Sequence, residues 1–591
     1  MEQCYKDALK RQRMHSIYDE KTGLLVRQVT QHKGTFYTSL SGEYHIIRES
    51  VFYGLGLMQE DPEANSVTVE KIIRTVCSLQ DTNPESPTFG VWPLYMEESL
   101  DKQPRPDWNW ADFCGRGLLQ LLIGYADWFS NETIKVIKTA VNNAAYRIMK
   151  RNVSPSYTNI SCMGTYTTLA AGEYLQDAEL SAYAKERFRK MYSFNTFHQC
   201  VSEYNSSTYT IESLVDLSLI AKDIHDAEIH EKAMILLDMQ WGYTLDHFCP
   251  ENGQWTGPQS RCYQTVQGNR FLSFLQVGAG DRVKLIAPKE IEVEPMWLQA
   301  GLHIPERYIG MLTAKDSAFF HRHPVLLDEP EIYASQFRNG NKSIGSFSFC
   351  DFWTQRRPVI AYFGTKDAPC YMRLRCMHDD FDFTSGLISC SQNKNVLLCG
   401  MSLCNDHGDR HFTMDPIEGK KIMASRLSFR FEFGGDKGII KSMTVEKCEN
   451  GFVVTVGDTV FSIYLGRSSF CGAELTSKWE EDENTKYLDL ILYDGEVKKI
   501  SIEDGMEAYF AAAIGMFEKD DIAAEHMFGE ISETTGRIWT NDRYSSYGAE
   551  YATYVGEYRK QITMMKETRG CNIVPARHVW RVAAKTDLGE E

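Results

Sequence analysis

The hydrophobic pattern changes its period near residue 305, and this change limits the possible fold more than any other feature. Before this point apolar residues recur every three to four positions, as in NETIKVIKTAVNNAAYRIMKRN, which predicts amphipathic helices. After it apolar and polar residues alternate, as in RLSFRFEFGG and KYLDLILYDG, which predicts short strands. We therefore predict an α+β multidomain protein in which a helical domain precedes an antiparallel β domain.

The length of 591 residues exceeds what one core supports, since hydrophobic cores stop growing at ~250–300 residues. The helical half shows no repeat of the ~30–50 residues typical of solenoids. We predict an N-terminal (α/α) toroid of helical hairpins over residues 1–304 and an antiparallel β-sandwich over 305–530. The segment YGAEYATYVGEYRKQITMMKE predicts a helical tail within 531–591 that packs on the other domains.

The formal net charge of −17 argues against nucleic-acid and anionic-membrane partners, which are bound through clustered Lys and Arg. No apolar run approaches the ~20 residues of a membrane span, and the N-terminus lacks an apolar signal-peptide core. The 16 cysteines never form CxxC. We therefore expect a cytoplasmic protein with reduced thiols, no metal and no cofactor. The oligomeric state stays open, with a homo-oligomer among the alternatives.

The motif DWNWADF combines two carboxylates with two indoles. Asp107 follows a proline-rich approach and is a natural helix N-cap, and Asp112 then lies in the first turn. In the functional alternative, Asp107 or Asp112 faces a cleft beside Trp108 or Trp110, where burial against the indole would raise the carboxyl pKa and suit a general acid. Trp92, in GVWPLY, is either a sugar platform or a core residue.

The motif EYNSSTYTIESL concentrates hydrogen-bonding groups just ahead of an apolar helical stripe. Ser207 or Thr208 can cap this helix, and Glu212 then completes a loose capping box. Helix capping therefore explains part of the motif without any catalytic role, although Glu212 is also a candidate for substrate binding.

Capping leaves the residues on the approach to this helix unexplained. We interpret Glu203 as a catalytic acid or base, with Asn205 and Tyr209 beside the substrate. His198, five residues before Glu203, is a further candidate for substrate binding.

In the motif GPQSRCYQT, Arg261 and Tyr263 are separated by one residue, so an extended chain directs both to one side. Arg holds a carboxylate through two parallel hydrogen bonds, as binding of a uronic acid requires. The alternative is an Arg that ties the loop to a backbone carbonyl. His321 and His323, in FFHRHPV, lie near the predicted domain junction, and the sequence leaves open whether they reach the cleft.

Three segments resemble, in order and spacing, the six-hairpin (α/α) toroid carbohydrate-active enzymes: GVWPLYMEESLDKQPRPDWNWADFCGRGLLQLL, EYNSSTYTIESLVDLSLIA and GPQSRCYQTVQGN. These enzymes include glycoside hydrolases acting on uronic acids and the heparinase II/III-like and alginate-type polysaccharide lyases. The resemblance covers residues 40–300 by motif and the remainder by architecture alone. It implies a carbohydrate-active enzyme whose oligosaccharide substrate contains uronic acid.

Two chemistries compete, and hydrolysis is the preferred prediction. A glycosidase needs one carboxyl group as acid and a second as base or nucleophile. The carboxylates available for these roles are Asp107, Asp112, Glu203 and Glu212. We predict a glycoside hydrolase that removes glucuronate-type units from oligosaccharide ends.

The first alternative is a lyase that cleaves by β-elimination, in which Asn or Arg neutralises the uronate and Tyr or His moves protons. The residues suited to these roles are Asn205, Arg261, Tyr209, Tyr263 and His198. The lyases that the chain resembles carry an Asn-His motif, whereas Asn205 is followed by Ser206, so we place the lyase second. The other alternative is a non-catalytic sugar-binding protein.

Overall fold

The computed structural model describes residues 1–31, 37–315, 318–327, 331–403, 421–501 and 508–519, and the backbone of four further strands between 531 and 586. The chain divides into two compact units. The first unit comprises residues 1–246 and 268–313, and the second comprises 247–267 and 314–591. The boundary predicted after residue 304 therefore lies close to the observed one after 313.

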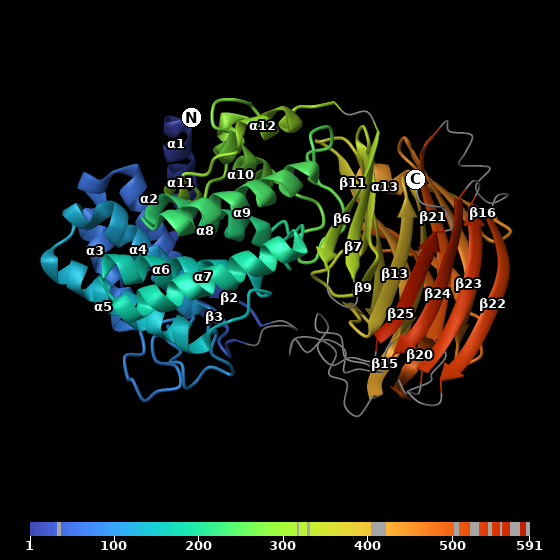
Figure 1. Cartoon of the computed structure of the whole chain (residues 1–591), viewed down its shortest axis with the longest axis horizontal. Coiled ribbons are helices and arrows are strands. Elements are labelled where there is room, and N and C mark those ends of the chain that lie inside the picture. Colours follow the sequence, from blue (N-terminus) through green and yellow to red (C-terminus); the bar gives the residue numbers. More distant parts are fainter. Residues whose placement is uncertain are drawn as a thin grey trace. The chain divides into compact units, whose positions relative to one another are not determined.

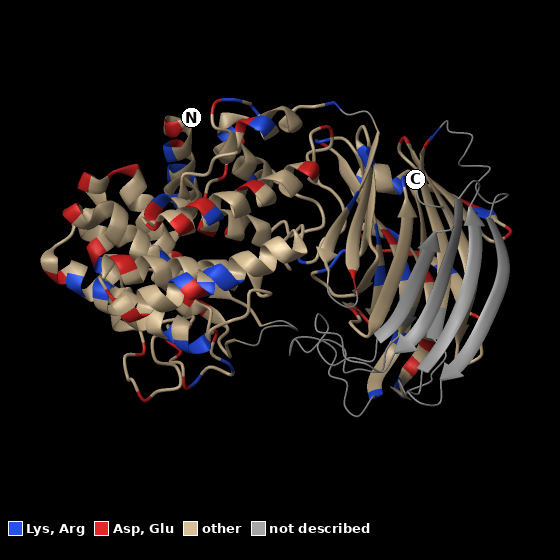
Figure 2. Ribbon diagram, viewed as in Figure 1, with Lys and Arg blue, Asp and Glu red and all other residues tan. Residues whose placement is uncertain are grey.

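The first unit is built mainly from helices, along which acidic and basic residues are interspersed (Figures 1 and 2). The longer helices are α1 (Glu2–Arg13), α2 (Arg48–Glu60), α3 (Pro62–Ser78), α4 (Trp110–Tyr125), α5 (Asn131–Arg151), α6 (Thr158–Tyr174), α7 (Ala178–His198), α8 (Tyr209–Asp223), α9 (Ala227–Asp246) and α10 (Asn269–Ala279). The short ones are η1 (Ala126–Trp128), η2 (Pro288–Glu290), α11 (Pro295–Ala300), α12 (Glu306–Ile309) and η3 (Gly310–Leu312).

These helices form a closed inner ring with further helices packed outside it. Consecutive helices pair as α2 with α3, α4 with α5, α6 with α7, and α8 with α9. Within the inner ring α2, α4, α6 and α8 each pack on the next, and α11 closes the ring by packing on both α8 and α2. Helix α6 is buried without interruption from Thr158 to Gly172, as expected for an inner helix covered on all sides. The structure thus confirms the predicted (α/α) toroid.

A small antiparallel sheet, absent from the sequence prediction, lies between α1 and α2 in the chain. Its strands are β1 (Ile17–Asp19), β2 (Leu24–Val29) and β3 (Gly42–Ile46), with β2 in the middle. The turn from β1 to β2 is closed by Asp19, whose carboxylate accepts the backbone N–H groups of Lys21 and Thr22. The segment LLVRQV, which forms β2, is too short for periodicity alone to distinguish a strand from a turn of helix, and this explains why the sheet was not predicted.

The second unit is an antiparallel β-sandwich of two large sheets, as predicted. The nine-stranded sheet contains β6 (Phe319–Leu326), β7 (Ile332–Asn339), β8 (Lys342–Phe347), β10 (Val359–Gly364), β11 (Pro369–His378), β12 (Phe381–Asp382), β15 (Lys421–Gly435), β19 (Thr476–Glu481) and β20 (Thr485–Ser501). The seven-stranded sheet contains β9 (Phe349–Asp351), β13 (Gly386–Asn393), β14 (Val396–Leu403), β16 (Thr444–Cys448), β17 (Gly451–Val456), β18 (Thr459–Phe470) and β21 (Ala508–Glu518). A short helix, α13 (Lys437–Lys441), follows β15.

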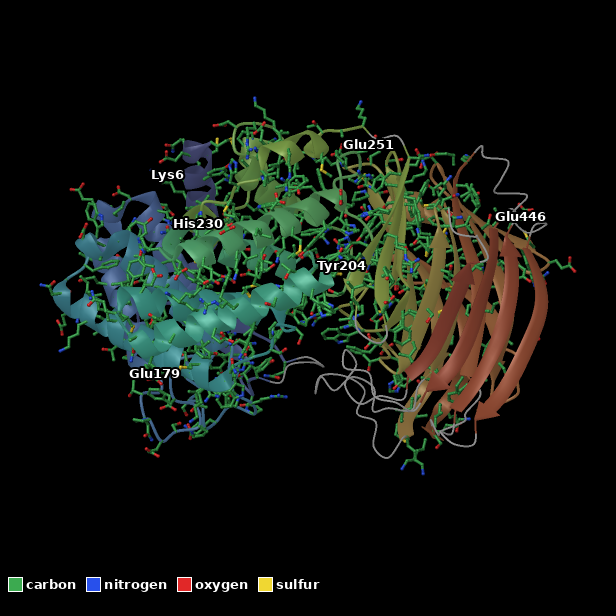
Figure 3. The ribbon with its side chains drawn as sticks, in the orientation of Figure 1. Lys6, Glu179, Tyr204, His230, Glu251 and Glu446 are labelled. Carbon is green, nitrogen blue, oxygen red and sulfur yellow. The ribbon has the colours of Figure 1, made fainter. Side chains whose placement is uncertain are left out.

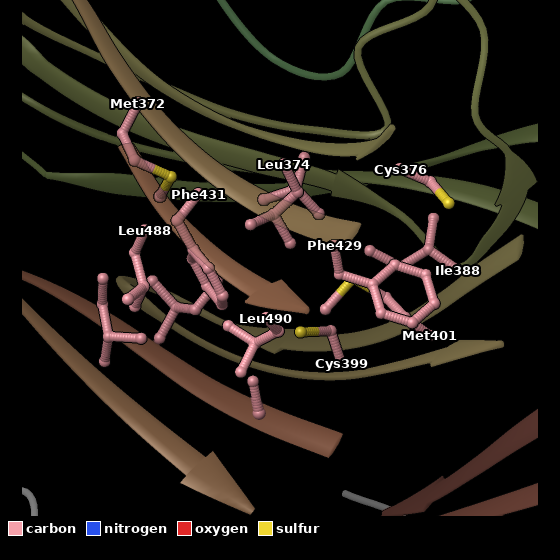
Figure 4. Close-up of a cluster of buried hydrophobic side chains, with 14 of the residues drawn as sticks. Met372, Leu374, Cys376, Ile388, Cys399, Met401, Phe429, Phe431, Leu488 and Leu490 are labelled. Atoms are coloured by element: carbon pink, nitrogen blue, oxygen red, sulfur yellow. The ribbon is translucent and has the colours of Figure 1, made fainter. Parts of the chain in front are cut away.

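The core of this unit lies between the two sheets (Figure 4). Phe429 and Phe431 of β15 approach Phe510 of β21, with ring centroids 6.4 and 6.2 Å apart. Between them Arg430 points to the opposite face of the sheet, where it pairs with Asp489 of β20. This alternation of inward phenylalanines and outward charges is the period of two that the sequence displays.

The predicted helical tail is wrong. Four antiparallel strands occupy this region: β22 (Ile531–Asn541), β23 (Ser546–Val555), β24 (Tyr558–Glu567) and β25 (Val579–Thr586). Tyrosines at 547, 551, 554 and 558 are spaced like one face of a helix, which misled the prediction. Aromatic and β-branched residues also favour strands, and pairing with neighbouring strands overrides a spacing that suits both structures.

One segment of the helical half, 247–267, belongs to the second unit. It forms a hairpin of β4 (Phe248–Cys249) and β5 (Gln254–Trp255), and Gln259 then pairs antiparallel with Arg357. Gly257 permits this packing, since a Cβ atom there would lie 2.6 Å from Gln336 Oε1, and its φ of +80° favours glycine. The motif GPQSRCYQT is therefore built onto the sandwich.

Candidate active site

Side-chain hydrogen bonds tie together the N-terminal ends of neighbouring inner helices in the first unit. Asn109, just before α4, donates from Nδ2 to the hydroxyl of Tyr157, just before α6, at 3.2 Å. Arg151, the last residue of α5, donates from Nη1 to Asn109 Oδ1 at 2.7 Å. All three side chains are half-buried. Because helix N-termini carry partial positive charge, this arrangement favours an anionic ligand.

Asp107 lies on the approach to α4 and is half-buried. Its Oδ1 accepts the backbone N–H of Asn109 at 3.0 Å. This hydrogen bond closes a turn from Asp107 to Asn109, directly before α4 begins at Trp110. Burial raises the pKa of Asp107, against the opposing effects of Arg48 and Arg151. A catalytic role for Asp107 stays a prediction.

Asp112 is enclosed in the packed layer between α4 and α6, and only 2% of the residue is exposed. Its nearest cation is Arg151, at 3.8 Å, and a Cβ atom on Gly164 of α6 would lie 2.6 Å from its Oδ1. Burial raises the pKa of Asp112 to about 7. A carboxyl group enclosed by α6 in this way is poorly placed to reach a glycan oxygen, and the catalytic role of Asp112 stays a prediction.

The three tryptophans of these motifs differ in accessibility. Trp92 is fully buried, and its indole N–H donates to the carbonyl of Val76 at 2.8 Å, so it is a core residue and not a sugar platform. Trp110 is also buried. Trp108 is half-buried, with the guanidinium of Arg147 at 4.0 Å from its ring centroid, and a role in substrate binding stays a prediction.

Glu203 holds the loop before α8 onto the first turn of α6. Its Oε2 accepts the backbone N–H of Asn159 at 2.7 Å, and the Asn159 Nδ2 lies 2.9 and 2.7 Å from its two oxygens. In return, the Glu203 backbone N–H donates to Thr158 Oγ1 at 3.1 Å. With 6% exposure and both oxygens accepting hydrogen bonds, Glu203 is well placed to position the loop, and its role as acid or base stays a prediction.

The rest of the loop is packed inward. Tyr204, labelled in Figure 3, is buried with its ring 5.6 Å from that of Tyr243. Asn205 is fully buried and has a φ of +50°, a left-handed conformation that Asn tolerates better than most residues. This conformation shapes the loop, and direct contact between Asn205 and a substrate stays a prediction. Tyr209, the first residue of α8, remains half-buried, so its catalytic role stays a prediction.

Thr208, one of the two predicted positions, is the N-cap residue of α8, but its side chain makes no capping hydrogen bond. Ser206, not Ser207 or Thr208, accepts the backbone N–H of Tyr209, with an oxygen–nitrogen distance of 2.9 Å. Glu212 instead pairs with Arg116 of α4 at 3.1 Å and keeps 17% of its side chain exposed. Glu212 thus takes no part in a capping box, and its substrate-binding role stays a prediction.

Arg116 also pairs with a second carboxylate inside the helical ring. Its Nη1 lies 2.8 Å from Oδ1 of Asp216, one turn after Glu212 on α8, and Asp216 is fully buried. Burial raises the pKa of Asp216 to about 7, although Arg116 opposes the shift. This ion pair joins α4 to α8 and leaves neither charge accessible to a glycan.

His198 ends α7 and is 2% exposed. Its ring meets the rings of Phe194 and Phe197 edge-on, with centroids 4.5 and 4.8 Å apart. A role of His198 in substrate binding stays a prediction.

Arg261 and Tyr263 belong to the second unit. Arg261 is half-buried, the next residue, Cys262, is fully buried, and Tyr263 is 57% exposed, an alternation that fits the extended conformation predicted for this loop. His321 and His323 lie on β6 of the same unit, with ring centroids 5.9 Å apart. Roles for Arg261 and Tyr263 in binding and catalysis stay predictions.

The sequence prediction missed three polar residues that the structure brings together, namely Asn109, Arg151 and Tyr157. Two of them, Asn109 and Tyr157, directly precede an inner helix, where polar residues are usually taken for caps. Only the position of Asn109 inside DWNWADF could have drawn attention to it, because both neighbouring aspartates were weighed and the amide between them was not.

Within the described parts of both units, no helix is long and apolar enough to cross a membrane. The same residues contain no group of three His, Cys, Asp or Glu side chains placed to hold a metal ion.

Fold and site together define a protein with an (α/α) toroid, a polar cluster at its inner-helix ends and a β-sandwich. A family model described as a domain of unknown function (DUF8769) matches residues 7–289. No curated protein matches the sequence.

Several solved structures are similar to the whole chain. Heparinase III has a TM-score of 0.43 and 9% identity, with coverage of 96% of this chain and 91% of that chain. The chondroitin AC lyase of Streptomyces coelicolor A3, in complex with chondroitin sulphate, has a TM-score of 0.44 and 9% identity, with coverage of 96% and 88%. A Paenibacillus xanthan lyase has a TM-score of 0.43 and 8% identity, with coverage of 95% and 62%. Identities and scores this low carry no argument about chemistry.

Proposed function

We propose that this protein is a lyase that cleaves glycans containing uronic acid by β-elimination. The observation that carries the proposal is the hydrogen-bonded group of Asn109, Arg151 and Tyr157. It joins an amide, a guanidinium and a phenol, and all three side chains are half-buried and so partly accessible. These are the chemical groups that elimination next to a carboxylate requires.

The first step removes the proton at C5 of the uronate, which is acidic only when the charge of the adjacent carboxylate is neutralised. Arg151 and the amide of Asn109 would bind that carboxylate and stabilise the charge that develops on it. Tyr157, as its phenolate, would accept the C5 proton. The partial positive charge of the α4 and α6 N-termini acts in the same direction.

The second step breaks the bond between C4 and the glycosidic oxygen. The electron pair of the C5 carbanion forms the C4–C5 double bond, and the leaving oxygen takes a proton from a tyrosine. Tyr209, half-buried at the start of the neighbouring helix α8, is our candidate for that donor. The products are a sugar with a new hydroxyl and an unsaturated uronate, and no water is consumed.

Hydrolysis is less well supported because two of the four carboxylates predicted for it are buried, and the two that stay partly exposed are engaged in other contacts. Asp112 is enclosed between α4 and α6, and both oxygens of Glu203 accept hydrogen bonds from Asn159. Of the four carboxylates predicted for this role, only Asp107 and Glu212 keep appreciable exposure. A glycosidase needs two accessible carboxyl groups at a defined separation.

The test is to measure kcat/KM of the Asn109→Ala variant on uronate oligosaccharides. We expect a loss of at least about 10²-fold, the effect typical of removing one group that stabilises a developing oxyanion. Asn65→Ala is the matched control, because Asn65 is half-buried in the first turn of α3 and donates only to backbone carbonyls. Equal activity of the two folded variants would refute the role of Asn109.

A further inference from the structure

A histidine in the small sheet of the first unit has a carboxylate on each of its two ring nitrogens. His45 Nε2 lies 3.0 Å from Asp19 Oδ2, and His45 Nδ1 contacts Glu97 Oε1. Asp19 ends β1, His45 lies on β3, and Glu97 belongs to the segment between α3 and α4. This group, which we call the His45 cluster, therefore joins stretches of chain that are 26 and 52 positions apart.

The segment that carries Glu97 runs along the end of β3. The Ile47 N–H donates to the carbonyl of Leu94 at 3.4 Å, and the Met96 N–H donates to the carbonyl of His45 at 3.0 Å. Glu97 then reaches back to β3, because its Oε2 accepts the backbone N–H of His45 at 3.1 Å. The attachment of this segment to the sheet therefore depends on a few backbone hydrogen bonds and on the grip of Glu97 on one histidine.

Only a protonated imidazole satisfies both carboxylates. The imidazolium donates from each ring nitrogen, whereas the neutral ring donates from one nitrogen and presents a lone pair at the other. Asp19 stays ionised, because the backbone N–H of Lys21 and the hydroxyl of Thr22 lower its pKa to about 2. Burial alone would lower the pKa of His45, but the hydrogen bonds and charges of Glu97 and Asp19 outweigh burial and raise this pKa above its ordinary value.

The other charged groups around the His45 cluster have partners of their own or are exposed. Arg27 of β2 and Arg48 of α2 both pair with Glu49 of α2, at 3.8 and 2.6 Å. Glu98 accepts the backbone N–H and the hydroxyl of Ser39. Of the remaining charged side chains described in this sheet and its turns, those that are exposed are Glu20, Lys21 and Glu43. The charge of the cluster therefore changes near neutral pH through its histidine.

We propose that the His45 cluster is a pH-sensitive latch, which ties the turn after β1 and the segment with Glu97 to β3 while the imidazole is protonated. Loss of the proton leaves one carboxylate facing a lone pair, and that contact opens. Because the pKa of His45 is raised, the latch is fully closed below about pH 6.5, the ordinary histidine value, and opens as the pH rises through the folded-state pKa. The chain continues from Glu97 to Asn109, so opening loosens the approach to α4.

The first measurement is an NMR titration of the full chain, isotope-labelled at histidine Cε1. The His45 signal is assigned by its loss in the His45→Gln variant. We expect the parent protein to titrate at His45 above about pH 6.5, and Glu97→Gln to lower this pKa, because the amide carries no charge that favours the imidazolium. A pKa of His45 that is not raised in the parent, or that stays the same in folded Glu97→Gln, would overturn the proposal.

Glu173→Gln is the matched control. Glu173, near the end of α6, also lies beside a histidine ring, 3.1 Å from Nδ1 of His225, but that histidine is exposed and lies outside the His45 cluster. The control makes the same change from carboxylate to amide beside an imidazole. We expect it to leave the titration of His45 unchanged, so a shift equal to that of Glu97→Gln would contradict the specific role of Glu97.

Hydrogen exchange tests the opening itself, because the Met96 amide is protected by its hydrogen bond to His45. As the pH rises through the His45 titration, we expect the protection factor of this amide to fall at least about twofold, the low end for loss of one hydrogen bond, with protection across α3 unchanged. In His45→Gln this fall should be absent. Equal pH dependence of Met96 protection in the parent and in His45→Gln would refute the latch. Neither measurement uses turnover, so the outcome is independent of the proposed elimination.

Discussion

Replacing Glu203 by Gln tests whether this carboxylate positions the loop before α8 or takes part in proton transfer. Glu203 accepts one backbone and one side-chain donor from Asn159, at distances of 2.7 to 2.9 Å. Hydrogen bonds to a charged group contribute about 1.5–3 kcal/mol each, against about 0.5–1.5 kcal/mol for neutral ones. Gln keeps the shape of the Glu203 side chain, but its NH2 group would face either Asn159 Nδ2 or the Asn159 backbone N–H. Both of these groups are donors, so one hydrogen bond would be lost. We therefore expect a loss of about 3 kcal/mol of local stability.

Hydrogen exchange measures this loss directly, because opening of the loop exposes the Asn159 amide. We expect Glu203→Gln to raise exchange at Asn159 and across residues 199–208, with kcat lowered but the pH–rate profile unchanged in shape. Glu98→Gln is the matched control: Glu98 is also buried and accepts the backbone N–H and the hydroxyl of Ser39. It should leave exchange at 199–208 unchanged. Loss of one limb of the pH–rate profile in Glu203→Gln, with normal exchange, would refute the positioning role.

Two further predictions concern stability. Because burial raises the pKa of Asp112 to about 7, the folded state binds a proton between about pH 4 and 7 that the unfolded state does not. Unfolding free energy should therefore fall as pH rises through this window, and Asp112→Asn should flatten that slope in denaturant titrations; an unchanged slope would contradict the assignment. Arg116→Met strands a buried carboxylate and should cost about 3–5 kcal/mol in the same assay. Arg189→Met, at an exposed ion pair with a glutamate, should cost far less stability than Arg116→Met, and equal costs would contradict the account.

The architecture was predictable because it depends on the average pattern of many residues. The change of period near residue 305 follows from how helices and strands expose side chains. A closed ring of helices is one of the few folds that bury the apolar faces of so many helices at once. The prediction of a helical tail failed because one sequence pattern suits both a helix and a strand. The tyrosines of β23 and β24 fit a helix face and a strand equally well, and only strand pairing decides between them.

The site was harder to predict, because a side chain's accessibility depends on contacts that are distant in sequence. Glu203 looked catalytic from its motif, yet its partner Asn159 lies 44 positions away. Asp112 is enclosed because Gly164 allows α6 to approach α4, which no local pattern reports. Conversely, nothing in the sequence near Asn109 indicates that Arg151 and Tyr157, 42 and 48 positions away, are its hydrogen-bond partners.

The central claim is that the chain cleaves uronate glycans by elimination. The most direct measurement is the product of a reaction run in water labelled with heavy oxygen, analysed by mass spectrometry and ultraviolet absorbance. We predict an unsaturated uronate at the new chain end, a rise in absorbance from its conjugated double bond, and no heavy oxygen in either product at the cleaved bond. A saturated uronate that carries one heavy oxygen, formed without a rise in absorbance, would contradict the claim and establish hydrolysis.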